Sequence, residues 1–288
     1  MLGEQPVNLV DLGPLDPPDG DPLVPLLFVH GLSGSWQNWL ENLPAFAPGH
    51  RVLAMDLPGF GATPMPASGR VSIAGYATLL VALLDLLEIP RACVVGNSMG
   101  GFIALEFALA APERVDSLVL VSPAGIGART QRNDRLLGGL RRVERLILAG
   151  GGMLAANADW VARRARLRRA AMQVAVHRPD KLPNALMSEQ IRQSNGKPGF
   201  VAALDAITDH DVEERLGDIA CRTLLYWGRD DRLVPVRDAA RFLELIPDAR
   251  LVVLDETGHL AMLERPARFN ADLAAWLAGS SVGRTTAL

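Results

Sequence analysis

Residues 92–110 read ACVVGNSMGGFIALEFALA, a short apolar run, a Gly-rich turn and a longer apolar stretch. The run before the turn is typical of a buried strand, and the stretch after it has the length and spacing of a helix. Gly96, Ser98 and Gly100 form the pattern G-x-S-x-G at the junction. A serine on such a turn projects its hydroxyl above the sheet edge, and the flanking glycines remove β-carbons that would collide where strand and helix converge. We predict that Ser98 is an exposed nucleophile at a helix N-terminus.

Five other short apolar runs have strand character and alternate with stretches of helical periodicity. The runs are 26–30, 51–56, 117–122, 223–228 and 250–255, and the helical stretches are 72–88, 101–111, 235–246 and 264–277. This alternation predicts an α/β protein built on a mostly parallel, doubly wound sheet.

A long interval interrupts the alternation. About 100 residues separate Ser122, at the end of one predicted strand, from Arg222, at the start of the next, which exceeds an ordinary crossover. Residues 126–181 hold twelve Arg and one Lys against four acidic residues, in stretches of helical spacing such as 140–148 and 160–172. We interpret them as amphipathic helices whose arginines are solvated or paired, in preference to a site for anionic ligands.

The interval predicts a chain of two parts. One part is a single large α/β core, and the other is an insertion of helical character between the two strands. Apolar content around 136–154 and 182–191 indicates a mainly hydrophobic pocket.

The composition is that of an ordinary globular protein, with 49% hydrophobic and 21% charged residues among 288. The chain has 29 Lys and Arg against 32 Asp and Glu, a formal charge of −3, which argues against binding nucleic acid through bulk charge. The first 22 residues contain five prolines and several acidic residues where a secretory signal needs a basic start and an apolar stretch. No apolar run approaches the roughly 18 residues of a membrane span. We expect a cytoplasmic protein without a membrane span.

A serine hydroxyl needs a base to take its proton, and histidine suits this role near neutral pH. Of the five histidines, His259 alone follows the last predicted strand. In a doubly wound sheet the loop after that strand returns over the edge at which Ser98 emerges. We predict that His259 is the base. His30, within the segment HGLSG, is predicted to shape its loop through hydrogen bonds to the main chain.

An imidazole base in turn needs a carboxylate that fixes its tautomer and stabilises its cation. The segment WGRDDRLVP, residues 227–235, follows a predicted strand and offers Asp230 and Asp231. Adjacent side chains cannot both point at one imidazole, so we favour Asp231 and expect Asp230 to face solvent or form a turn. Asp255, at the end of the next strand, is a third candidate, and spacing alone does not decide among them.

Acyl transfer also needs hydrogen-bond donors for the oxyanion that develops. The loop over residues 30–34 follows the first apolar run and contains Leu32, and Met99 follows Ser98 at the start of a helix. We expect the main-chain N–H groups of Leu32 and Met99 to form the oxyanion hole.

Five segments, in their order along the chain, resemble the α/β-hydrolase fold superfamily. They are HGLSG, DLPGFG, GNSMGG, WGRDD followed by VP, and TGH, and the resemblance spans roughly residues 24 to 278. It implies a serine hydrolase whose core, residues 1–123 and 216–288, carries a helical cap, or lid, over residues 124–215. This cap is expected to set the size of the substrate. The resemblance also supports Asp231, because the acid of this superfamily usually occupies the fourth position of a G-x-x-D segment, which here begins at Gly228. Dehalogenases and epoxide hydrolases of this fold use an aspartate nucleophile, so Ser98 argues against both.

The sequence is also similar to meta-cleavage-product hydrolases of this superfamily, which split carbon–carbon bonds in vinylogous diketones. The similarity lies in GNSMGG, in residues 211–235 and in WQNWLEN. It implies that Asn42, Asn97 and Arg192 bind the carboxylate and keto groups of such a substrate.

The chain departs from those hydrolases at two places. Residues 33–35 read Ser-Gly-Ser where their loop typically continues as Gly-Pro-Gly, and Leu260 stands at the substrate-binding position where an aromatic residue is expected. The segments SPAGIG and GHLAMLERP instead resemble general carboxylesterases and lipases.

Three functions follow as hypotheses. The first is a serine hydrolase without cofactor or metal, which cleaves carboxylic esters through an acyl-enzyme, with Ser98 attacking, His259 moving the proton and Asp231 orienting His259. The second keeps these residues and cleaves a carbon–carbon bond of meta-ring-fission products. The third, a non-catalytic binding protein on the same fold, is disfavoured because all three triad positions are intact. The expected partner is a small, mainly apolar ester or ketone, and a homodimer is compatible with the sequence.

Overall fold

The computed structural model describes residues 2–14, 23–126, 152–193 and 198–280. Seven strands form one sheet in the order β1-β3-β2-β4-β5-β6-β7. All neighbouring pairs are parallel except β1 with β3, so the predicted mostly parallel α/β sheet is confirmed. The strands are β1 (Leu9–Leu12), β2 (Leu26–Val29), β3 (Val52–Met55), β4 (Ala92–Asn97), β5 (Val115–Val121), β6 (Arg222–Gly228) and β7 (Ala249–Leu254).

The sequence predicts six of these strands and misses β1. Strand β1 has four residues, two of them exposed, and it pairs only with β3 at the edge of the sheet. A short edge strand of this kind lacks the continuous apolar run by which the other six are predicted.

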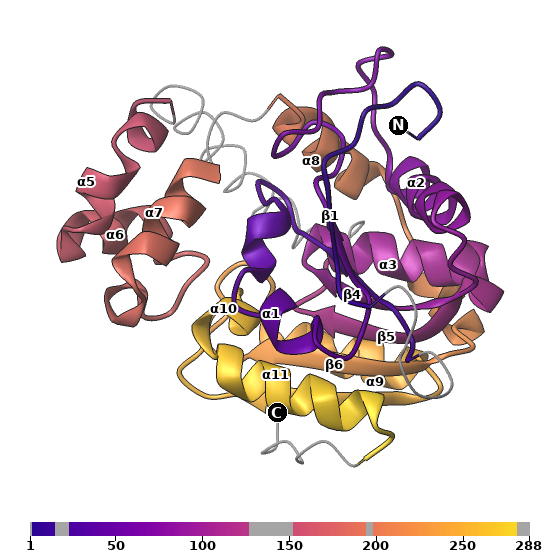
Figure 1. Cartoon of the computed structure of the whole chain (residues 1–288). Helices are drawn as coiled ribbons and strands as arrows, with labels where there is room; N and C mark the ends of the chain where they lie inside the picture. The colour runs from indigo at the N-terminus through magenta and orange to yellow at the C-terminus, as the bar shows by residue number, and fades with distance from the viewer. Residues whose placement is uncertain (1, 15–22, 127–151, 194–197, 281–288) are drawn as a thin grey trace.

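Helices cover both faces of the sheet (Figure 1). In β2, Leu26 and Phe28 point to one face, and Leu27 and Val29 point to the other. The face of Leu27 is covered by α2 (Ile73–Leu86), α3 (Met99–Ala110) and α9 (Ala239–Leu245), and the face of Leu26 by α1 (Leu43–Phe46), α10 (Ala261–Glu264) and α11 (Pro266–Leu277). Burial on both sides explains why β2 and β3 are apolar throughout. Within the described ranges, no helix combines the length and apolar character needed to cross a bilayer.

A helical insertion lies between β5 and β6, and its described helices are α5 (Ala158–Ala162), α6 (Ala165–Met172), α7 (Asn184–Gln193) and α8 (Phe200–Asp209). The first three lie to one side of the sheet and share an apolar cluster, to which α10 contributes Leu263 (Figure 1). Helix α8 instead packs on the main core through Ala203. The helix predicted over 140–148 and most of the apolar stretch 136–154 fall outside the described residues.

The strand order reverses between β2 and β4, because β3 pairs with β2 on its other side. In open α/β sheets, ligands bind beyond the carboxyl ends of the strands at such a reversal. The loop after β2 and the turn after β4 meet here, since Val29 pairs in register with Gly96. The fold therefore places the HGLSG and GNSMGG segments side by side.

Candidate active site

Ser98 lies on a strained turn between β4 and α3. Its φ is 56°, in the left-handed region, which costs a serine on the order of 1–3 kcal/mol. The main chain holds the turn, because the N–H of Ser98 donates to the Val121 carbonyl at 3.0 Å and its own carbonyl accepts from Phe102 and Ala124 at 3.1 Å each. Ser98 is partly exposed while the residues on either side are buried. The turn therefore presents Ser98, and not its neighbours, at the sheet edge.

Three glycines allow the chain to pass this closely. A β-carbon at Gly96 would overlap the carbonyl oxygen of Gly100, and one at Gly100 would overlap the carbonyl oxygen of Val29. A β-carbon at Gly101 would lie 2.8 Å from Cβ of Pro123. The glycine spacing of this segment is therefore required by the contact of α3 with β4, with the end of β2 and with the loop after β5.

The loop after β2 packs directly against the Ser98 turn. A β-carbon at Gly31 would lie 3.0 Å from Cβ of Ser98. The N–H of Gly34 donates to the Gly31 carbonyl at 3.0 Å and closes a tight turn in which Ser33 has a φ of 62°. This hydrogen bond does not use the N–H of Leu32. The N–H of Met99, in the first turn of α3, likewise has no partner within its own helix.

His30 binds the main chain of its own and a neighbouring loop, so its predicted role in shaping the loop is confirmed. Its Nε2 accepts the N–H of Leu57 at 2.9 Å, and its Nδ1 donates to the carbonyl of Gly31 at 2.8 Å. The ring is fully buried. With both nitrogens bound to the main chain, His30 is unavailable as a base.

His259 and Asp231 form a buried pair. Nδ1 of His259 lies 2.7 Å from Oδ2 of Asp231, and the side chains are 4% and 0% exposed. Oδ1 of Asp231 accepts the N–H groups of Leu233 and Val234 at 2.8 and 2.9 Å. Both carboxylate oxygens are therefore engaged, and the proton of the imidazole is held on Nδ1.

Asn97 joins the two halves of the site. Its Nδ2 donates to the carbonyl of Val121 at 3.0 Å and to the carbonyl of His259 at 3.3 Å. Because Asn97 immediately precedes Ser98, the loop that carries His259 is fixed beside the Ser98 turn. The two bonds use both N–H groups of the amide, so only Oδ1 of Asn97 is left to face a ligand.

The other two aspartates considered from the sequence have different partners. The side chain of Asp230 is 42% exposed and lies 3.7 Å from Nδ1 of His177. Asp255 pairs with Arg229 at 2.5 Å. Asp231 is thus the carboxylate that meets His259.

Two residues predicted to bind substrate are engaged elsewhere. Asn42 is fully buried, and its Nδ2 donates to Oδ1 of Asn270 at 2.8 Å and to the carbonyl of Met262 at 3.3 Å, which joins α1 to α10 and α11. Arg192 on α7 is 45% exposed and pairs with Glu189 at 2.7 Å and with Asp159 at 3.2 Å. The structure does not bring either side chain to the Ser98 turn by a hydrogen bond or ion pair.

Leu260 follows His259 and joins the core to the insertion. Its side chain packs against the apolar cluster on the α11 face of the sheet and against the cluster shared by α5, α6 and α7. Its N–H donates to the carbonyl of Ala175 at 3.2 Å.

The sequence analysis misses a buried polar link between the insertion and the loop after β2. Nδ2 of Asn38, in the 3₁₀ helix η1 (Trp36–Trp39), donates to Oε1 of Gln190 at 2.6 Å, and Nε2 of Gln190 donates to the carbonyl of Gln37 at 3.2 Å. The signal for it is present in α7, where Gln190 is a polar residue on the apolar stripe of Met187 and Ile191.

The sequence analysis also assigns no role to Glu264, whose carboxylate lies near His259. Glu264 accepts the N–H of Gly258 at 2.8 Å and the N–H of His177 at 2.9 Å. Burial raises the pKa of Glu264 to about 7, against the opposing effect of main-chain N–H groups and of Arg265, which favour its ionised form. Across the described stretches, no group of three His, Cys, Asp or Glu side chains is arranged to hold a metal ion.

The fold and the segments at this edge define a class of protein. The family model of the α/β hydrolase fold matches residues 24–266, so the chain belongs to that family.

Three proteins similar to this chain have names that state an activity. A 2-hydroxy-6-oxo-6-phenylhexa-2,4-dienoate hydrolase of Comamonas testosteroni is 32% identical over 245 residues, covering 83% of this chain and 81% of that protein. The solved structure of a meta-cleavage product hydrolase from Pseudomonas fluorescens IP01 has a TM-score of 0.70 at 26% identity, covering 96% of this chain and 94% of that one. Est816, described as an N-acyl homoserine lactone degrading enzyme, has a TM-score of 0.69 at 26% identity, covering 94% and 97%. The chain is therefore similar to hydrolases of more than one bond type.

Proposed function

We propose that this chain is a serine-dependent hydrolase that cleaves the carbon–carbon bond of meta-ring-fission products. Ser98 is the nucleophile, His259 the base and Asp231 its carboxylate partner. The observation that supports this most is the 2.7 Å hydrogen bond between buried His259 and Asp231, in a loop fixed beside the Ser98 turn. The choice of bond follows the similarity to a dienoate hydrolase at 32% identity.

Each group has one step in the proposed reaction. Asp231 holds the proton of His259 on Nδ1, so Nε2 can accept the proton of the Ser98 hydroxyl as Oγ attacks a carbonyl carbon. The N–H groups of Leu32 and Met99 donate to the oxyanion of the tetrahedral intermediate. Removal of one such donor typically costs about 3–4 kcal/mol of transition-state stabilisation.

Cleavage of a carbon–carbon bond needs a carbon leaving group that can hold an electron pair. In a 2-hydroxy-6-oxo-2,4-dienoate, ketonisation of the 2-hydroxyl group moves its proton to C5. Attack of Ser98 on C6 gives an alkoxide, whose collapse breaks the C5–C6 bond and delocalises the electron pair onto the 2-oxo group. His259 gives this oxygen the proton that it took from Ser98, so the products of this step are an acyl ester of Ser98 and 2-hydroxypenta-2,4-dienoate, and His259 can act as a base again. A water molecule deprotonated by His259 then releases the carboxylic acid.

Carboxylic ester hydrolysis is the second candidate. It uses the same three residues and needs no cation for a substrate carboxylate. Arg192, which the resemblance places with two asparagines among the groups that bind the carboxylate and keto groups, is instead paired with Glu189 and Asp159. This observation favours the ester reaction.

We further propose that the insertion acts as a cap over the site and that the substrate is a small, largely apolar molecule. Leu260 and Leu263 belong to the apolar cluster of the insertion and lie within four residues of His259. The apolar cluster of the insertion is thus packed against residues next to the predicted base.

A comparison of two substrates tests the proposal. The values of kcat/KM are measured for 2-hydroxy-6-oxo-6-phenylhexa-2,4-dienoate and for p-nitrophenyl butyrate, with wild type and with Ser98→Ala. We expect the dienoate to be the better substrate and Ser98→Ala to abolish turnover of both while the protein remains folded. A higher kcat/KM for the ester would support the second candidate. Turnover of neither substrate by wild type, or retained turnover by Ser98→Ala, would contradict the assignment of the site.

A further inference from the structure

One segment of the insertion, residues 173–178, is bonded to the loop that carries His259. We call it the brace segment. The carbonyl of Ala175 accepts the N–H of His259 at 2.9 Å and that of Leu260 at 3.2 Å. The main chain of the predicted base is therefore held by the insertion as well as by the core.

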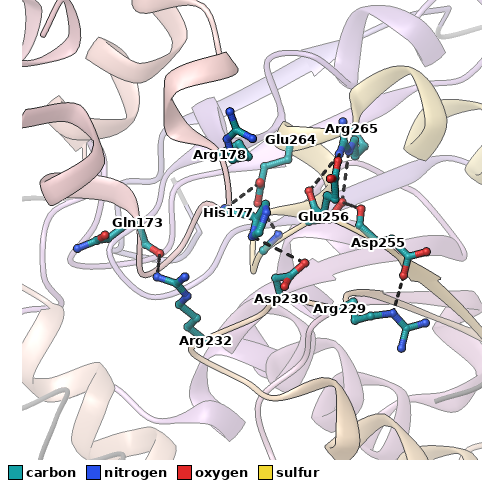
Figure 2. A network of polar contacts seen from close by, with 12 residues as sticks. Gln173, His177, Arg178, Arg229, Asp230, Arg232, Asp255, Glu256, Glu264 and Arg265 are labelled. Carbon is teal, nitrogen blue, oxygen red and sulfur yellow. Dashed lines mark hydrogen bonds and ion pairs between the residues drawn. The ribbon is translucent and has the colours of Figure 1, made fainter. Parts of the chain in front are cut away.

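The brace segment also contacts the loop that carries Asp231 (Figure 2). The carboxylate of Asp230 lies 3.7 Å from Nδ1 of His177, and Nη1 of Arg232 donates to the carbonyl of Gln173 at 3.4 Å. The residues on either side of Asp231 thus face the same six residues of the insertion that bind the His259 loop.

Glu264 connects the brace segment and the His259 loop through one carboxylate. Oε1 accepts the N–H of Gly258, directly before His259, at 2.8 Å. Oε2 accepts the N–H of His177 at 2.9 Å (Figure 2). The main chain at Gly258 passes close to both groups, since a β-carbon at Gly258 would lie 2.8 Å from the nitrogen of His177 and 2.9 Å from Oε1 of Glu264. No residue with a side chain can replace Gly258 unless one of these groups moves.

We propose that Glu264 is a positioning residue that couples the placement of the insertion to the placement of His259. The inference rests on the proposed function of His259 as the base. One carboxylate accepts from both segments, so a displacement of the brace segment also displaces the loop that carries the base. Glutamine cannot replace Glu264 in this role, because its amide nitrogen would face one of the two N–H donors.

The test compares Glu264→Gln with Glu256→Gln. Glu256 lies in the same loop, is exposed, and contacts Arg265 at 3.8 Å, with no hydrogen bond to the brace segment in the described part of the chain. Wild type is assayed first on the phenyl dienoate and on p-nitrophenyl butyrate. With the better substrate, Glu264→Gln should lower kcat by 10- to 100-fold with KM within threefold of wild type, and Glu256→Gln should change both by less than twofold. The split between kcat and KM separates displacement of the base from a loss of substrate binding.

Hydrogen–deuterium exchange gives a readout that does not depend on activity. In Glu264→Gln the amides of the brace segment and those of residues 257–260 should exchange faster together, and in Glu256→Gln neither set should change. Wild-type kcat in Glu264→Gln, a loss confined to KM, an equal loss in Glu256→Gln, or faster exchange in one segment alone would overturn the inference. Fast exchange of the Gly258 and His177 amides in wild type would also overturn it, even if Glu264→Gln fails to fold.

Activity and exchange together separate the two proposals. Absence of turnover by wild type on both substrates would contradict the proposed function. The exchange data would then still decide whether Glu264 holds the two segments together.

Discussion

Two neighbouring aspartates show how the turn after β6 gives one residue type two environments. Asp231 is turned inward, where Leu233 and Val234 donate to one oxygen and His259 lies against the other. Asp230 is turned outward and is 42% exposed. From the sequence alone both remain candidates, because spacing gives no information on which of two adjacent side chains points inward.

This difference predicts unequal effects of the same substitution. Asp231→Asn should lower kcat by roughly 10³–10⁴-fold, because an amide at this position favours the wrong tautomer of His259. Asp230→Asn should lower it by less than tenfold. Steady-state kinetics on the better of the two substrates measures both variants, and thermal unfolding confirms that each remains folded. Equal losses would mean that Asp231 is not the specific partner of the base.

At the scale of whole elements, the sequence predicts the strands and helices that are mostly buried. Strands β2 to β7 and the helices α2, α3, α9 and α11 follow from apolar runs and helical periodicity. The Ser98 turn follows from glycines that a local motif contains. Edge strand β1 has no such run because half of it is exposed. The link between Gln190 and Asn38 joins residues 152 positions apart, so no local pattern could pair them.

That link gives a prediction for the packing of α7 on η1. Gln190→Leu introduces an apolar side chain of similar size and leaves Nδ2 of Asn38 buried without its acceptor, which should lower the free energy of unfolding by about 1–3 kcal/mol. The matched control is Gln193→Leu on the same helix, whose side chain binds Glu189 one turn away on a less buried face, and whose effect should stay within about 0.5 kcal/mol. Urea unfolding measures both, and a smaller effect for Gln190→Leu than for Gln193→Leu would contradict the role of this link.

At the scale of the whole molecule, the insertion and the core meet at the residues around His259. Leu260 and Leu263 pack into the cluster of the insertion, and the carbonyl of Ala175 and the carboxylate of Glu264 bind main chain across the boundary. The sequence predicts that an insertion exists and where it begins and ends along the chain. It gives no sign of which core loop the insertion contacts, because that depends on three-dimensional packing.

The raised pKa of Glu264 predicts how the free energy of unfolding depends on pH. Its ordinary pKa is 4.5, and burial raises it to about 7 in the folded chain, so the folded state binds the proton more tightly than the unfolded state does. The contribution of this group to the free energy of unfolding is therefore full below about pH 4.5 and is lost as pH rises through about 7, with an upper limit of roughly 3 kcal/mol.

Urea unfolding between pH 5 and 8 tests this dependence. The difference in unfolding free energy, wild type minus Glu264→Gln, should fall as pH rises, whereas the difference between wild type and Glu256→Gln should stay level. A wild-type advantage that grows with pH would show that the ionised form of Glu264 is the one favoured by folding.

The central claim is that Ser98 is made nucleophilic by His259, and chemical labelling tests it most directly. Wild type and Ser98→Ala are treated with a fluorophosphonate at pH 7.5, and the modified residue is identified by peptide mass spectrometry. We predict a single adduct on Ser98, no adduct in Ser98→Ala, and labelling at least 100-fold slower in His259→Ala. An unlabelled Ser98 in folded wild type, or equal labelling rates in wild type and His259→Ala, would contradict the account.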